Sequence, residues 1–66
     1  MNKEEAQKAF NIAADFYNHA LASERKAAKS GEWNSVEILR SRENEAMSEM
    51  WKLLAKFPAL DQSKVA

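Results

Sequence analysis

The sequence predicts an all-α protein, an antiparallel two-helix hairpin that dimerises into a four-helix bundle. Three observations support this fold class. The 66 residues include a single glycine and a single proline, so residues that break helices are rare. Apolar residues recur in steps of three and four on both sides of the glycine, which is the spacing of amphipathic helices. A chain of this size buries only about 60% of the surface that its unfolded form exposes, so one copy has a marginal core.

The first helix is expected over residues 3–29. Alanine, the strongest helix former, is frequent there. Acidic residues stand near the start of this segment and basic residues near its end, which suits the helix dipole. The apolar side chains form two neighbouring columns, Ala6, Phe10, Ala13, Tyr17 and Ala20 in the first and Ala9, Ile12 and Phe16 in the second. Gly31 then supplies a residue that tolerates the positive φ of a helix C-cap.

The turn is expected over residues 30–33, with Asn34 as the N-cap of the second helix. Glu37 stands three residues later, where its carboxylate can accept a hydrogen bond from the backbone N–H of the cap. Trp33 and Ile38 then occupy the two positions of a hydrophobic staple, which fixes the angle at which a chain enters a helix. The alternative is that Trp33 is an exposed aromatic side chain offered to a partner.

The second helix is expected over residues 34–57, because Pro58 disfavours helical geometry at the residue before it. Its core-facing column reads Val36, Leu39, Glu43, Ala46, Met50, Leu53 and Phe57, with Met47, Trp51 and Leu54 alongside. Residues 1–57 therefore form the hairpin. Residues 58–66 lack a periodic pattern and are expected to be a frayed C-terminal tail.

Folding the chain at the turn sets small residues of the first helix opposite larger ones of the second. The expected pairs are Ala6 with Phe57, Ala13 with Met50, and Ala20 with Glu43. Nearer the turn the seam becomes polar. Two glutamates take core-like positions there with three arginines close by, which predicts ion pairs between the helices that help to fix their register. These residues are Glu24 and Glu43, and Arg25, Arg40 and Arg42.

The apolar surface is wider than one facing helix can cover. A single seam needs one column on each helix, whereas both helices carry two adjacent columns over part of their length. A second copy that completes a four-helix bundle is the simplest way to bury the excess. The residues expected at this dimer or partner interface are Phe10, Phe16, Tyr17, Met47, Met50, Trp51 and Leu54.

No catalytic constellation stands out. The chain has no cysteine and one histidine, which excludes disulfides and thiolate metal sites. Asp15 and His19 lie four residues apart on one helix, as do Glu45 and Glu49, but a closed metal site needs more ligands. Both pairs are therefore interpreted as solvated surface residues. We expect no enzymatic activity, no metal and no cofactor.

Charge and hydropathy narrow the function classes further. Ten basic and ten acidic residues give a net charge of +0, which argues against broad binding to nucleic acid or anionic membranes. No apolar run approaches the ~20 residues of a membrane span. The N-terminus lacks the basic and apolar regions of a signal peptide, and cysteine is absent, so a cytoplasmic location is expected.

The opening MNKEEAQKAFNIAADF and the end of the second helix, LLAKF at residues 53–57, resemble the Rop-type plasmid copy-number regulators. The chain length and the hairpin with its short turn are similar as well. The resemblance implies a helical hairpin that dimerises into a four-helix bundle and binds a pair of kissing RNA loops through the faces of the first helices.

The residues that this resemblance points to lie on the outer face of the first helix. Asn11 and Lys26 match residues of the family's RNA-binding face, and His19 replaces a polar one; Lys8 shares that face by helical spacing. Asp15 stands where the family has an aromatic residue. The glycine and tryptophan of the turn also replace the family's short acidic loop.

Two functions are therefore expected from the sequence. The first is a small non-enzymatic regulatory or adaptor protein that acts through protein–protein association as a homodimeric helical bundle. The alternative is an RNA-binding regulator of the Rop type, which uses the outer face of the first helix. The partners expected are a second copy of the chain, another protein or structured RNA. No membrane is expected among them.

Overall fold

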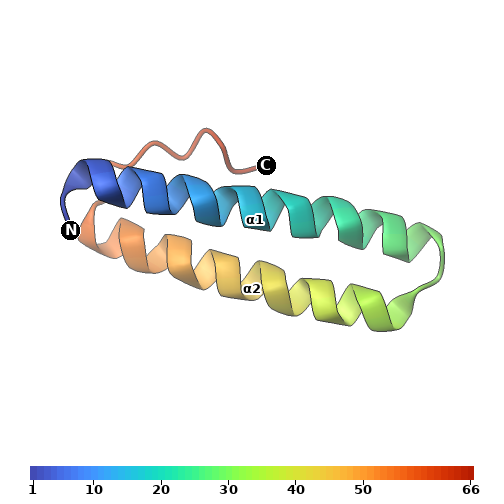
Figure 1. Cartoon of the computed structure of the whole chain (residues 1–66). Helices are drawn as coiled ribbons and strands as arrows, with labels where there is room; N and C mark the ends of the chain where they lie inside the picture. The colour runs from blue at the N-terminus through green and yellow to red at the C-terminus, as the bar shows by residue number, and fades with distance from the viewer.

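In a computed structural model that describes residues 1–66, two long helices lie side by side as an antiparallel hairpin (Figure 1). Helix α1 spans Lys3–Lys29 and helix α2 spans Trp33–Lys56. The molecule measures 42 × 17 × 14 Å, so it is a rod that is two helices wide. The all-α hairpin predicted from the sequence is confirmed, while the pairing of two copies stays a prediction.

The turn owes its shape to the glycine. The N–H of Glu32 donates to the carbonyl of Ala27 at 2.9 Å, and the N–H of Gly31 donates to the carbonyl of Ala28 at 3.2 Å. These two hydrogen bonds form a Schellman motif, whose central residue must adopt the left-handed conformation. Gly31 does so with a φ of 72°, which confirms its predicted role after the helix.

The predicted capping box and staple at the start of α2 are wrong. The helix begins at Trp33, and its N-cap is Glu32, which makes no side-chain capping hydrogen bond. The reason is that the Schellman motif turns the chain so tightly that the carbonyl of Glu32 already accepts a helical hydrogen bond from Val36 at 3.1 Å. Asn34 therefore lies inside the first turn of the helix. Trp33 and Ile38 are 64% and 56% exposed, so they do not pack as a buried staple.

Helix α2 ends one residue earlier than expected. Lys56 is its last helical residue, and Phe57 forms the C-cap with non-helical angles, φ −132° and ψ 76°. Pro58 explains this geometry, because its ring clashes with a helical conformation at the preceding residue.

The seam between the helices follows a seven-residue spacing. On α1 its buried residues are Ala6, Ala13, Ala20 and Ala27, and on α2 they include Val36, Glu43 and Met50, with Phe57 partly buried. Every buried seam residue of α1 is therefore an alanine, whereas α2 contributes larger side chains. The close approach of the two backbones expected from this pattern stays a prediction. Most of the larger apolar side chains lie to either side of the seam.

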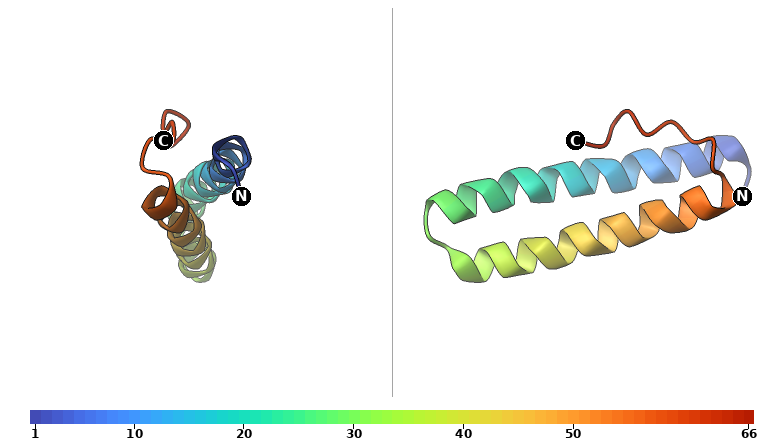
Figure 2. Two further views of the ribbon diagram at one scale, coloured as in Figure 1. Left: turned by 90° about the vertical axis from the view of Figure 1, so that its left-hand side faces the viewer. Right: turned by 180° about the vertical axis from the view of Figure 1, so that it is seen from behind.

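The C-terminal tail, residues 58–66, is not frayed as the sequence predicted. It turns back at Pro58 and runs along α1 as far as the middle of that helix (Figure 1). Viewed along the rod, it lies on one side of the plane of the two helices (Figure 2). Leu60 is only 4% exposed and belongs to the same buried cluster as Phe10 and Met50, and Val65 packs against that cluster.

Two amide side chains of α1 hold the tail in place. Gln7 donates from Nε2 to the carbonyl of Asp61 at 3.0 Å and accepts the N–H of Asp61 at 2.8 Å. Asn18 does the same farther along, with 2.6 Å to the carbonyl of Lys64 and 2.9 Å from the N–H of Ala66. Each side-chain amide thus pairs with one backbone N–H and one backbone carbonyl of the tail, which would otherwise lack a partner within the protein. The sequence predicted a frayed tail because these contacts join residues about fifty positions apart, and such contacts leave no local pattern in the sequence.

Candidate functional site

The tail divides the surface of the hairpin into two unlike sides. We call the side under the tail the tail face and define it by Phe10, Ala14, Tyr17, Met47 and Leu54. The opposite side, which we call the bare face, carries a groove between the helices and has no covering segment. Its apolar residues are Ile12 and Phe16 on α1 and Leu39 and Leu53 on α2.

The residues predicted to form an interface are split by this arrangement. Phe10 and Met50 are 1% and 6% exposed, so they are core residues of a single chain and are not available to a partner in this conformation. Tyr17, Met47 and Leu54 are half-buried beside the tail. The tail and the seam shelter all five. Of the seven predicted residues, only two remain largely uncovered, Phe16 and Trp51, each at 69%.

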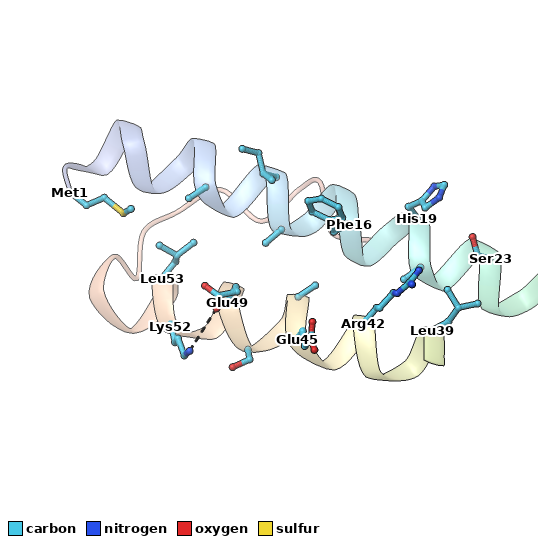
Figure 3. Close-up of a pocket in the computed structure, with 16 residues that line it drawn as sticks. Met1, Phe16, His19, Ser23, Leu39, Arg42, Glu45, Glu49, Lys52 and Leu53 are labelled. Atoms are coloured by element: carbon cyan, nitrogen blue, oxygen red, sulfur yellow. Dashed lines mark ion pairs between the residues drawn. The ribbon is translucent and has the colours of Figure 1, made fainter. Parts of the chain in front are cut away.

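The groove on the bare face has a volume of about 970 Å³. Ala9, Ala13, Ala20 and Ala46 contribute to its lining, and Ala13, Ala20 and Ala46 are buried. Ile12 is 59% exposed beside it. In Figure 3, Phe16 and His19 on α1 lie across the groove from Arg42 and Leu39 on α2. A floor of methyl groups with large apolar side chains at its edge is the shape that accepts another protein's side chains.

The rim of the groove on α2 is charged but balanced. Arg42 and Lys52 supply two positive charges, and Glu45 and Glu49 supply two negative ones. Lys52 lies 3.7 Å from Glu49, and Figure 3 marks this ion pair. A rim of mixed charge neither attracts a phosphate backbone strongly nor repels a second copy of itself.

The polar part of the seam contains one of the predicted inter-helix ion pairs. Arg40 Nε on α2 lies 3.5 Å from Glu24 Oε2 on α1. Glu43 is 8% exposed, and its Oε2 atom is buried without a hydrogen-bond partner. Burial raises the pKa of Glu43, the neighbouring Glu24 raises it further, and Arg40 partly opposes both effects. Arg25 forms no ion pair, so this cluster is smaller than predicted.

The outer face of α1 presents most of the residues singled out by the family resemblance. Lys8, His19 and Lys26 are exposed, and Asn11 accepts a hydrogen bond from Gln7 Nε2 at 3.0 Å. Asp15, which would repel phosphate, lies 3.7 Å from the ammonium group of Lys64 in the tail. The tail therefore brings a basic residue to this face, a contact that the sequence alone did not predict.

Other candidate residues are more isolated. Trp33 stands exposed at the tip of the hairpin beside Gly31 and Ser35, where the surface is only shallowly hollowed. No three metal-ligating side chains come together anywhere in the structure. Neither helix has a stretch both long and apolar enough to cross a bilayer. The most developed surface feature of the chain is the groove.

Sequence reasoning missed the prominence of Ile12 and the burial of Leu60. Ile12 could have been found from its column, because Ala9, Ile12 and Phe16 lie together beside the seam. The burial of Leu60 has no such signal, because residues 58–66 show no helical or strand periodicity.

Comparisons with protein-family models, with curated proteins and with solved structures found no match. The resemblance to the Rop-type regulators therefore stays a prediction.

Proposed function

We propose that the protein is a small non-enzymatic interaction module that pairs with a second copy of itself through the bare face. The observation that carries this proposal is the exposure of Phe16 and Ile12, at 69% and 59%, beside a groove whose floor is made of alanine. Leaving such side chains in water forgoes about 1.5–3 kcal/mol each, which an interface recovers. In a symmetric pair, Phe16 of each copy fills the groove of the other.

The dimensions of the rod suit such a pair. The rod is 42 Å long, so two copies that lie side by side through the bare face share an extended contact along the helices. The balanced rim of arginine, lysine and glutamate side chains also favours a copy of the same chain over a strongly charged partner. Two hairpins paired in this way make a four-helix bundle.

Sedimentation equilibrium of the full chain tests the proposal. We expect a particle of twice the 7.5 kDa of one chain. Phe16→Asp places a charge in the interface and is expected to shift the protein to monomer, while its helical circular dichroism is retained. Ala22→Asp is the matched control, because it adds the same charge at an exposed position of α1 outside the groove. A wild-type chain that stays folded and monomeric at every concentration would rule out the proposal.

A second candidate function is RNA binding through the outer face of α1, and the Asp15–Lys64 ion pair favours it. The ammonium group of Lys64 offsets the negative charge of Asp15, which shares the outer face of α1 with Lys8, His19 and Lys26. Titration of a stem-loop RNA should then show affinity that falls steeply between about 50 and 200 mM salt. Lys26→Ala should make that dependence shallower, whereas Lys56→Ala at the end of α2 serves as the control. Binding that is absent or insensitive to salt would reject this function.

A further inference from the structure

We infer that the C-terminal tail is a removable cover, which closes an apolar face of the hairpin that otherwise takes a second copy of this chain. The covered surface is the tail face. If the tail were absent, the hairpin would present apolar side chains on both of its broad sides. The tail would then decide how many faces of the hairpin are open for association.

The contacts that hold the tail are of a kind that can open without breaking the hairpin. Its apolar anchors are Leu60 and Val65, and its polar contacts are made by Gln7, Asn18 and Asp15 at positions that solvent reaches. The backbone of the tail makes only short turns of its own and adds no hydrogen bond to either helix ladder. A segment that adds no hydrogen bond to the helices can open locally while both helices stay formed.

The cover is also incomplete. Ala66 lies at Asn18, near the middle of α1 (Figure 1). Trp51 remains 69% exposed, and Tyr17 and Met47 are only half-buried. A second hairpin is broader than residues 58–66, so it can cover side chains that these residues leave in water.

A second copy fits this face by chemistry as well. The defining residues of the tail face are uncharged, so another apolar surface meets no buried charge there. Ala14, at 0% exposure, forms a low floor between larger neighbours and accepts the side chains that the tail now provides. In a two-fold pair, Leu54 and Trp51 of one copy pack on the tail face of the other copy. They take the place that Leu60 and Val65 hold within one chain.

The experiment compares the full chain with a chain that ends at Phe57, by sedimentation equilibrium at matched concentrations. We expect truncation to double the number of chains per particle relative to the full chain, because one further closed interface becomes available. Leu60→Asp in the full chain should have the same effect, since a carboxylate cannot occupy the buried site. Ala59→Asp adds the same charge at an exposed tail position and should leave the mass unchanged.

Two results would overturn the inference. One is a truncated chain and a Leu60→Asp chain that keep their helices and form particles with the same number of chains as the full chain. The other is a truncated chain that is unfolded at every concentration, because a second copy then fails to replace the tail. Phe16→Asp in the truncated chain separates this inference from the proposed function. If only the bare face associates, that substitution abolishes association; if the tail face associates, the mass stays above that of a single chain.

Discussion

The two broad sides of the hairpin start from similar helical patterns and end in different states. Each carries a column of apolar residues beside the alanine-rich seam, with Phe10 and Tyr17 on one side and Ile12 and Phe16 on the other. The tail covers the first and leaves the second in solvent. Helical periodicity therefore establishes which side chains leave the seam, whereas an aperiodic segment decides which of them remain available to a partner.

The energetic contrast between the sides follows from burial. Phe10 is 1% exposed under the tail and Phe16 is 69% exposed across the rod. Removing a buried phenylalanine side chain leaves a cavity, whereas removing an exposed one leaves only solvent. The same residue type thus supports the fold on one side and is free for association on the other.

The largest expected effect tests this pair of phenylalanines. Phe10→Ala should lower the free energy of unfolding by about 3–5 kcal/mol, through lost burial and the cavity that remains. Phe16→Ala should change the stability of the single chain by less than about 0.5 kcal/mol. Urea unfolding at the lowest usable protein concentration measures both. Equal losses for the two variants would contradict the assignment of one side as covered and the other as bare.

A smaller effect is expected at the cover itself. Leu60→Ala should cost about 2–3 kcal/mol, at the low end for buried leucine because the tail can readjust. Val65 is only partly buried, so Val65→Ala should cost less. Ala59→Ser, on the exposed part of the tail, should be neutral and serves as the control. Hydrogen exchange of the Asp61 and Ala66 amides would show whether the tail has been released, and unchanged protection in Leu60→Ala would contradict a role for Leu60 as the main anchor.

The seam shared by both sides gives a pH-dependent prediction. Burial raises the pKa of Glu43, so the folded chain binds a proton more tightly there than the unfolded chain does. Stability should therefore fall as the pH rises from the ordinary pKa of a glutamate through the raised pKa of Glu43. Glu43→Leu should remove that slope and stabilise the protein by about 1–2 kcal/mol at neutral pH.

The control for this slope is Glu37→Leu, since Glu37 is an exposed glutamate of the same helix. Urea unfolding at a series of pH values measures both variants beside the wild type. Glu24 and Arg40 are the charged groups that act on Glu43, so both residues are left unchanged in every variant. If the wild type gained stability as the pH rose through this range, the assignment of Glu43 as an unfavourably buried carboxylate would be wrong.

The smallest effect is expected for the side-chain amides of α1 that bind the backbone of the tail. Asn18 makes two hydrogen bonds to the tail backbone, at 2.6 and 2.9 Å. Asn18→Ala should cost about 1 kcal/mol, since each bond lies near solvent and contributes modestly. Ser23→Ala, on the groove side of α1, removes a polar group with no such contacts and should be neutral. Thermal unfolding measures the melting temperature of both variants. Equal melting temperatures would show that the hydrogen bonds of Asn18 to the tail add no stability.

Much of the hairpin could be predicted because its signals are local. Steps of three and four placed both helices, and Gly31 marked the turn through its backbone freedom. The start of α2 was missed because two local signals compete there. Asn34 is a good N-cap, but the Schellman motif at the glycine leaves no extended residue before Trp33, and the helix begins too early for the cap to form.

The candidate site was predicted only in part, for a different physical reason. The excess of apolar surface is visible in the sequence, and Phe16 was named from it. Which side is bare depends on Leu60 and Val65, together with the side-chain amides of Gln7 and Asn18. These amides bind the backbone of Asp61, Lys64 and Ala66 in the tail. A chain segment without a period carries no signal of the face on which it will pack, so the burial of Phe10 beneath the tail emerges only from the folded molecule.

Isotope-filtered nuclear Overhauser spectroscopy on an equal mixture of labelled and unlabelled chains tests most directly that the bare face pairs while the tail face is covered from within. We predict contacts between chains at Ile12 and Phe16, and contacts only within a chain at Phe10 and Leu60. Contacts between chains at Phe10 and Leu60, or none at Ile12 and Phe16, would contradict this assignment of the two faces.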